Sequence, residues 1–319
     1  MIRGIHHVGV SVVDVPRAAS VYGAAFPLEP GRRLTVRDSA ETRSLLGLSG
    51  EVSAELLISR APNMYFEFFR FEAPHPGSPR QREANEPGLA HICVQSRELN
   101  PTRERLEAEG VVFTSPPCDL GTGIAYSYGR DPDLNLLETE AVPGAPTDPP
   151  AWVGHVAFVT ADLERLTRFY GALVDRPVVG GARLPPRPAF DEITGLEGVD
   201  LSAAWIPGLN VGLEFWRYHN PPTVAEAAQR PVSDLGWTHL CFEVEDVRAA
   251  ADHAVRLGAV LHCPPTENAL ADVAYARDPD GNVVEFVRWK GSAADLSIDH
   301  LPHLDVVARV AAARAEARA

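Results

Sequence analysis

The sequence predicts an α+β protein built from four copies of one module, in which a strand is followed by a helix and further strands. The stretch GLAHICV returns later as GWTHLCF, which places His91 and His239 148 residues apart. A spacing of 84 residues separates His7 from His91, and the same spacing separates His155 from His239. Each histidine begins a strand-like stretch that a helix-like stretch follows, so the four positions mark four modules.

The duplication extends beyond the histidines. At an offset of 147 or 148 residues, other positions recur as Tyr22 and Tyr170, Gly110 and Gly258, Asp131 and Asp278, and Glu138 and Glu285. So many matches at one offset indicate an internal duplication. We place modules one to four at about 1–72, 87–141, 151–218 and 236–290, from the repeated pattern.

The two halves of the duplication are expected to be two domains, at 1–145 and 151–290. The proline-rich stretch VPGAPTDPP joins them and has the composition of a linker. Residues 291–319 are expected to form a C-terminal helical tail, because apolar residues there have helical spacing at Leu304, Val307, Val310 and Ala311.

The composition is that of an ordinary globular protein. The chain has 319 residues, of which 45% are hydrophobic and 23% charged, and this length suits about two domains. A net charge of −14 disfavours nucleic acids and anionic membranes as partners, and no apolar run is long enough for a transmembrane helix. The four cysteines, Cys93, Cys118, Cys241 and Cys263, lack CxxC spacing, so we expect reduced thiols and a cytoplasmic location.

The first strand of each module carries its histidine. In module one, Val8, Val10 and Val12 alternate with small or polar residues, so one face of the strand is apolar and the other is not. This alternation directs His7 toward a cavity and His6 toward the helix side or solvent. A helix is expected next, for example over residues 15–26.

The last strand of each module is apolar except for one glutamate. In modules two and four it follows the tight turns DPDLN and DPDGN, whose residue types fit turn chemistry. Leu134 stands where the second turn has Gly281. If this position needs a positive φ, leucine is costly there, so we expect the first turn to differ locally.

Eight polar side chains thus recur at matching places in core-like strands. Buried imidazoles and carboxylates need a hydrogen-bond partner or a cation, and together they suit a divalent ion such as Fe, Mn, Co, Ni or Zn. We expect Cys93 and Cys241, on the same face as the histidines, to line the cavity rather than bind metal. The candidate metal ligands are His7, Glu67, His91, Glu138, His155, Glu214, His239 and Glu285.

The repeated module, with histidine at its head and DPDGNVVEF at its tail, resembles the vicinal oxygen chelate superfamily. That group includes glyoxalase I, methylmalonyl-CoA epimerase, bleomycin and fosfomycin resistance proteins and extradiol dioxygenases. The resemblance covers residues 3–290. It implies paired βαβββ modules, each pair a curled mixed-sheet half-barrel around a metal-bearing cavity with helices outside. It also implies that the first and last strands of both modules supply the ligands.

Two pairings of the modules are open. Adjacent pairing is the default for short connections and groups the ligands by half, with His7, Glu67, His91 and Glu138 in the first centre. Some members of the superfamily are expected to pair module one with four and two with three. Both pairings leave two histidines and two glutamates in each cavity. Whether both centres are active is also open, and the regular turn at Gly281 favours the centre of the second half.

The resemblance implies a divalent-metal-dependent, glyoxalase-like enzyme. It would be an isomerase, epimerase or lyase acting on a small substrate with vicinal oxygens through a metal-bound enolate. A glutamate that loosens from the metal can serve as the base, and we prefer Glu67 and Glu214, which lie beside aromatic residues. The expected partner is a small-molecule substrate, not nucleic acid or a membrane, and a homodimer is an open alternative to a monomer.

An Fe(II) extradiol ring-cleaving dioxygenase is the main alternative. YARDPDGNVVE resembles the tail of that group's signature, which makes Tyr275, and Tyr128 at the matching position, candidate catalytic residues. The signature also expects a histidine shortly before the tyrosine, and ENALADVAY has none. A further alternative is a metal-free small-molecule binding or resistance protein, which the eight retained polar residues disfavour.

Overall fold

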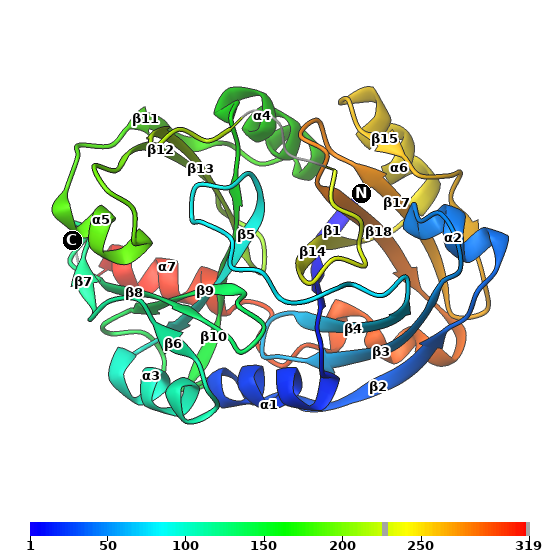
Figure 1. Ribbon diagram of the computed structural model, residues 1–319, viewed down its shortest axis with the longest axis horizontal. Coiled ribbons are helices and arrows are strands. Elements are labelled where there is room, and N and C mark those ends of the chain that lie inside the picture. The colour runs from blue at the N-terminus through cyan, green and yellow to red at the C-terminus, as the bar shows by residue number, and fades with distance from the viewer. Residues whose placement is uncertain (225–228, 317–319) are drawn as a thin grey trace.

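The computed structural model describes residues 1–224 and 229–316. These residues form two open mixed sheets of nine strands each, with helices outside them (Figure 1). The predicted fold class, α+β with strand–helix–strand modules paired into two half-barrels, is confirmed.

Sheet A combines modules one and four. Its strands run in the order β15 (Val260–Leu261), β17 (Ala271–Arg277), β18 (Val283–Trp289), β14 (Gly236–Val244), β1 (Ile2–Ser11), β4 (Tyr65–Ala73), β3 (Ser53–Arg60) and β2 (Glu29–Val36), and β16 (Thr266–Glu267) pairs with β17. Strands β1 and β14, the first strands of the two modules, are antiparallel and join the modules at the middle of the sheet.

Sheet B combines modules two and three in the same way. Its order is β11 (Val179–Arg183), β12 (Asp200–Ile206), β13 (Gly212–Asn220), β10 (Ala151–Val159), β5 (Gly88–Ser96), β9 (Leu136–Ala141), β8 (Ala125–Arg130) and β6 (Val112–Phe113), and β7 (Cys118–Asp119) pairs with β8. Here β5 and β10 form the antiparallel junction.

Of the two pairings left open, the default of adjacent modules is therefore wrong, and the pairing of module one with four and of two with three is the one observed. The connection over residues 74–87 leads from β4 in sheet A to β5 in sheet B, while the linker between the halves joins β9 and β10 within sheet B. Adjacency in the chain favours pairing only where the connection is too short to reach another sheet. Each half, 1–145 and 151–290, thus contributes one module to each sheet.

One helix follows the first strand of every module. These helices are α1 (Val15–Ala25), α3 (Leu99–Ala108), α4 (Leu163–Val174) and α6 (Val247–Arg256), and the short helices α2 (Ala40–Leu46) and α5 (Pro188–Thr194) lie in modules one and three. Asp14, Asp162 and Asp246 cap α1, α4 and α6, because each side chain accepts a hydrogen bond from a backbone N–H in the first turn.

A continuous apolar core lies between the helices and the sheets. It includes Val8 and Val10 of β1 and Tyr22 of α1, which confirms the predicted apolar face of the first strand. Figure 1 shows α1 and α3 along the lower edge and α4 and α6 along the upper edge. The opposite face of each sheet carries the candidate ligands.

A pair of buried asparagines connects the two sheets. Asn63 precedes β4 and bonds through its amide to both the N–H and the carbonyl of Val153 in β10. Asn210, at the matching position in the second half, bonds in the same way to Ile5 in β1. Each sheet is thus tied to the other by a side chain that satisfies backbone groups of a central strand.

The C-terminal region divides between the two sheets. The 3₁₀ turns η1 (Gly291–Leu296) and η2 (Ile298–His300) add Leu296 and Ile298 to the apolar cluster of sheet A. Helix α7 (Val306–Glu316) instead packs Val306 and Val310 against Trp152 of sheet B. Residues 317–319 of the predicted tail lie outside the described part of the chain.

The two DPD turns have the same conformation, which corrects the expectation that the first would differ. Leu134 has φ 67° and Gly281 has φ 89°. In both turns the N–H of this residue donates to the carbonyl of the aspartate that begins the turn, Asp131 or Asp278. The ladder between the last two strands imposes the turn, so leucine accepts the left-handed conformation.

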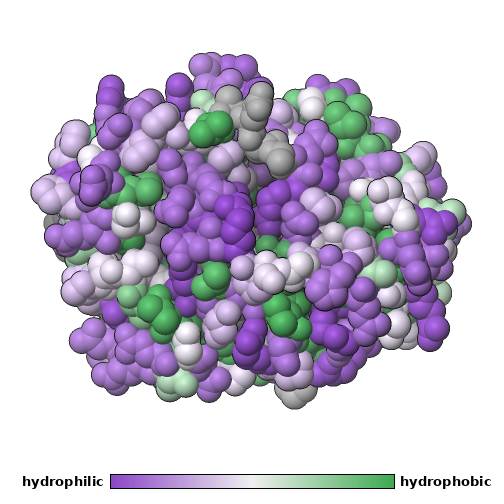
Figure 2. All heavy atoms as spheres, in the orientation of Figure 1, coloured by the Kyte–Doolittle hydropathy of each residue, from purple (hydrophilic) through white to green (hydrophobic). Residues whose placement is uncertain are grey.

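Hydrophilic side chains cover most of the face in Figure 2, and the hydrophobic ones form small separate patches. None of the helices in the described residues is long and apolar enough to span a membrane. All four cysteines are unpaired.

Two candidate metal centres

The structure gathers the eight predicted ligands into two clusters. Centre A consists of His7, Glu67, His239 and Glu285, and centre B consists of His91, Glu138, His155 and Glu214. In each cluster the four candidate ligand atoms lie within 4.8 Å of one another. The grouping by sequence half is therefore wrong, because each centre draws one histidine and one glutamate from each half.

The ligand atoms of centre A come from the four central strands of sheet A. Nε2 of His7 lies 3.3 Å from Oε2 of Glu67 and 3.0 Å from Oε2 of Glu285. Nε2 of His239 lies 3.1 Å and 3.2 Å from the same two oxygens. All four groups therefore face one point.

Centre B repeats this arrangement in sheet B. Nε2 of His155 lies 2.9 Å from Oε2 of Glu138 and 3.1 Å from Oε2 of Glu214. Nε2 of His91 is slightly farther from these oxygens, at 3.5 Å and 3.6 Å.

The donor atoms fit a divalent metal ion. Oε2 of all four glutamates, and Nε2 of His91 and His155, are buried and have no hydrogen-bond partner among the described residues. Unpaired buried oxygens are costly unless a cation meets them, and two imidazoles with two carboxylates suit a borderline divalent ion.

The electrostatics of centre B also suit a cation. Burial alone would raise the pKa of Glu214, but the nearby imidazoles of His155 and His91 hold it far below its usual value. Burial opposes charge on His91, yet the nearby carboxylates of Glu138 and Glu214 raise its pKa above the usual value. The carboxylates therefore remain ionised and favour positive charge at this point.

A cavity of about 610 Å³ opens onto centre B. Glu138, His155 and Glu214 lie in its wall, together with Gly154 and Gly212. Its aromatic lining is provided by Tyr126, Phe190, Trp205 and Trp216. A volume of this size suits a small organic ligand.

Three residues at this cavity escaped the sequence reasoning. Trp205 is paired in register with Glu214, and its indole N–H donates to Oε1 of Glu214 at 2.8 Å. Glu140 accepts a hydrogen bond from the Gln95 amide; burial and the negative charge of Glu138 raise the pKa of Glu140 to about 7. Glu140 could have been found by alternation, since it stands two residues after Glu138 on the same face. Unlike Glu138, however, it does not recur in the other modules.

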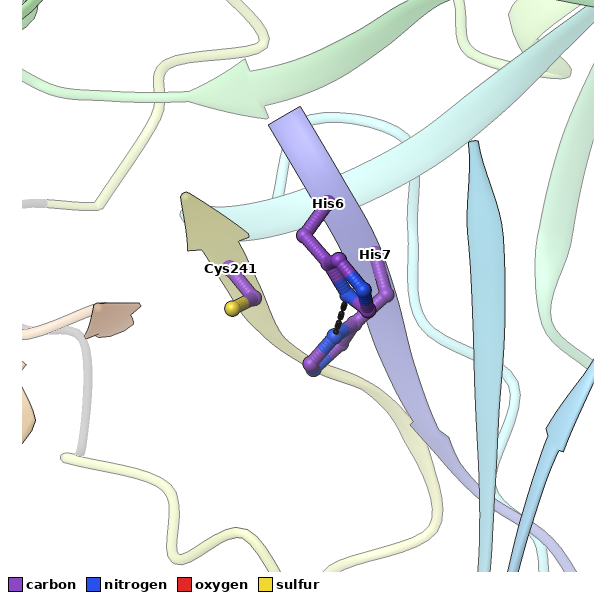
Figure 3. A group of neighbouring side chains, drawn as sticks. All are labelled: His6, His7 and Cys241. Atoms are coloured by element: carbon purple, nitrogen blue, oxygen red, sulfur yellow. Dashed lines mark hydrogen bonds between the residues drawn. The ribbon is translucent and has the colours of Figure 1, made fainter. Parts of the chain in front are cut away.

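The side chains around centre A differ from those around centre B, and His6 is the first of them. His6 and His7 approach each other through their Nδ1 atoms at 2.7 Å, and Cys241 lies beside them (Figure 3). His6 is fully buried and stacks on Tyr65, so the expectation that it points to the helices or to solvent is wrong. An irregularity in the pairing of β1 between Ile5 and His7 breaks the alternation on which that expectation rested.

The two predicted tyrosines lie next to ligands. Tyr128 is paired in register with Glu138, and its ring centre is 5.1 Å from that of His91. Tyr275 is paired with Glu285 and lies 5.5 Å from His239. Both hydroxyls are buried, and burial together with the neighbouring glutamate raises the pKa of each well above its usual value. They are therefore protonated and can donate a hydrogen bond.

Two family models match the chain. One, described as a glyoxalase-like domain, matches residues 155–287, and the other, described as the glyoxalase/bleomycin resistance protein/dioxygenase superfamily, matches residues 6–128. The chain is a two-domain member of the vicinal oxygen chelate superfamily.

Solved structures share the fold of this vicinal oxygen chelate protein. Glyoxalase I from Zea mays is 17% identical with a TM-score of 0.63, and the match covers 89% of this chain and 92% of that one. A protein from Bacillus subtilis that carries a provisional dioxygenase name is 12% identical with a TM-score of 0.59, covering 97% and 96%. The curated proteins contain no match to this chain.

Proposed function

We propose that centre B is the active site of a divalent-metal-dependent enzyme, an isomerase, epimerase or lyase that removes a proton next to a carbonyl of a small substrate with vicinal oxygens. The supporting observation is that two imidazoles and two carboxylates converge, and that three of the four, Glu138, His155 and Glu214, lie in the wall of a cavity large enough for such a substrate. Four protein ligands leave about two positions open on a six-coordinate ion.

A divalent ion held by these residues would polarise the substrate carbonyl and so make the neighbouring C–H more acidic. Glu214 is the candidate base, because its Oε2 lies unpaired at the cavity while Trp205 holds its Oε1. Glu67, the other preferred base, lies in centre A. Tyr128, which pairs in register with Glu138, is the candidate hydrogen-bond donor at centre B.

The cavity lining indicates the substrate class. The rings of Phe190, Trp205 and Trp216 favour a planar or apolar part. Gln95, Glu140 and Arg187 lie in the same wall and would meet polar groups of the substrate. We therefore infer a partly apolar α-hydroxycarbonyl compound.

The two alternatives have less support. Fe(II) ring cleavage uses two histidines and one carboxylate, whereas each centre here has two carboxylates. A metal-free binding protein would have no use for four unpaired buried glutamate oxygens. The cytoplasmic location and the homodimer stay predictions.

One experiment separates the three functions. The purified protein is reconstituted with Mn, Fe, Co, Ni or Zn and incubated in D₂O with a panel of α-hydroxycarbonyl compounds, and deuterium incorporation at the α-carbon is followed by NMR. We expect exchange that Glu214→Gln abolishes. Oxygen uptake with catechols would instead support the dioxygenase, and failure to bind any of the metals would support the binding protein.

A further inference from the structure

We propose that centre A is a closed, structural metal centre, whose ion fastens the first module to the last and exchanges far more slowly than the ion at centre B. This goes beyond the proposed function, because it assigns the two chemically equivalent ligand sets to different roles. Three observations support it. His6 and Tyr65 stand where centre B has glycines, residues 291–301 pack over these two side chains, and the four ligands come from strands that are far apart in sequence.

The first observation is that bulky side chains occupy in centre A the positions that are glycines in centre B. Tyr65 pairs in register with the ligand His7, and Gly212 pairs with the equivalent ligand His155. His6 precedes His7, and Gly154 precedes His155. The two glycines line the cavity of centre B.

In centre A the same positions are filled by two stacked rings. His6 and Tyr65 have ring centres 4.6 Å apart and an angle of 10° between their planes. The indole of Trp289 lies against His6, with its Nε1 2.7 Å from Nε2 of His6. These rings occupy the space through which a substrate would approach His7.

The second observation is that residues 291–301, here called the covering segment, close this side of sheet A. Nε2 of His6 lies 2.8 Å from the carbonyl of Leu296. Leu296, Ile298 and Leu301 belong to the same apolar cluster as Tyr65. His7 and His239 are 0% and 1% exposed, against 8% and 3% for His155 and His91, while the glutamates of the two centres are similar at 2–5%.

Glu243 anchors the covering segment. One carboxylate oxygen accepts from Arg3 at 2.5 Å and from the hydroxyl of Ser297 at 2.7 Å, and the other accepts from the N–H of Ile298 at 2.8 Å. The matching residue of sheet B is Gln95, which lies in the open cavity instead. Among the described residues, this anchor is therefore found beside centre A and not at the matching position in sheet B.

The third observation is the origin of the ligands. His7 lies on β1 and Glu285 on β18, at opposite ends of the module repeat, and Glu67 and His239 lie on β4 and β14 between them. An ion bound by all four would connect strands that are far apart in sequence, and such a connection stabilises the folded chain against the unfolded one. The contact between Nδ1 of His6 and Nδ1 of His7 (Figure 3) holds the His7 ring, whose Nε2 lies 3.0 Å from Oε2 of Glu285 in the centre.

Release of metal to a chelator tests the proposal. The full chain is loaded with Zn²⁺ alone, excess metal is removed, and Zn²⁺ transfer to a chromophoric chelator is followed with time. We expect two ions per chain and two phases, with the slow phase at least about tenfold slower, because the ion at centre A leaves only when the covering segment opens.

Variants assign the phases. Glu214→Gln should remove the fast ion, and Glu285→Gln should remove the slow ion and lower the Tm of the loaded protein by several degrees. Glu243→Gln changes no ligand and should speed the slow phase several-fold by loosening the covering segment. If Glu285→Gln does not fold, the wild-type phases and the effect of Glu243→Gln still decide.

Release of both ions in one fast phase, or a single ion per chain that Glu214→Gln removes, would overturn the proposal. So would a slow phase that Glu243→Gln leaves unchanged. These outcomes are independent of the proposed function, because catalysis at centre B needs only the fast ion. Two-phase release from a protein without deuterium-exchange activity would leave this inference standing and refute the function.

Discussion

Replacing Trp205 by phenylalanine should weaken metal binding at centre B and leave centre A unchanged. The indole N–H of Trp205 donates to Oε1 of Glu214 at 2.8 Å, and Oε2 of the same carboxylate faces the centre. Phenylalanine keeps an aromatic ring in the cavity wall but has no donor. Glu214 would then be freer to turn away from the other ligands.

The expected size follows from the bond that is lost. A hydrogen bond to an ionised carboxylate contributes about 1.5–3 kcal/mol, which corresponds to about 10–100-fold in a dissociation constant. The same range, about 10–100-fold, is typical for the loss of a residue that orients a metal ligand. Centre A provides an internal reference, because Ile58, not tryptophan, is paired in register with Glu67.

Competition with a chelator of known affinity measures both dissociation constants. Trp216→Phe is the matched control: Trp216 lines the same cavity, and its Nε1 has no hydrogen-bond partner in the described part of the chain. We expect Trp216→Phe to bind both ions like the wild type. The reasoning is refuted if Trp205→Phe leaves centre B unchanged, or if both variants weaken it equally.

Three other predictions concern the cavity, the turns and the junction of the sheets. Gly212→Tyr should close the cavity of centre B and lower kcat/KM at least about 100-fold while both ions stay bound. Gly212→Ala places a Cβ 3.3 Å from the backbone oxygen of Gly154, a tight contact that a small shift relieves, and should lower kcat/KM far less. Retained activity in the tyrosine variant would place the substrate elsewhere. Gly281→Ala should lower the free energy of unfolding by about 1 kcal/mol, because the φ of this residue is 89°. Leu134→Gly should not lower it. Urea unfolding measures both variants, and an equal loss of stability in the two would contradict the strain argument. Asn63→Ala removes the hydrogen bonds to Val153 and should lower the free energy of unfolding by about 3 kcal/mol. If the free energy of unfolding falls by less than about 1 kcal/mol, water takes the place of the amide.

Much of the candidate site follows from periodicity. The 148-residue offset and the alternation of β1 select His7, and the single glutamate of each last strand selects Glu67 and its three counterparts. These signals are local, because the alternation of residues within one strand is enough to distinguish its two faces. Glu140 was within reach of the same rule, whereas His6 was not, because the irregularity in β1 depends on its pairing with β14.

Sequence alone therefore settles the number of modules, their order of elements and the identity of the eight side chains. The tertiary structure decides which of them meet, because pairing of β1 with β14 and of β5 with β10 depends on contacts between modules, not within them. It also decides that a cavity opens onto centre B, whereas the rings of His6 and Tyr65 stack beside centre A. The difference between Gly212 and Tyr65 is visible in the sequence, but its meaning depends on residues 291–301, which pack on sheet A.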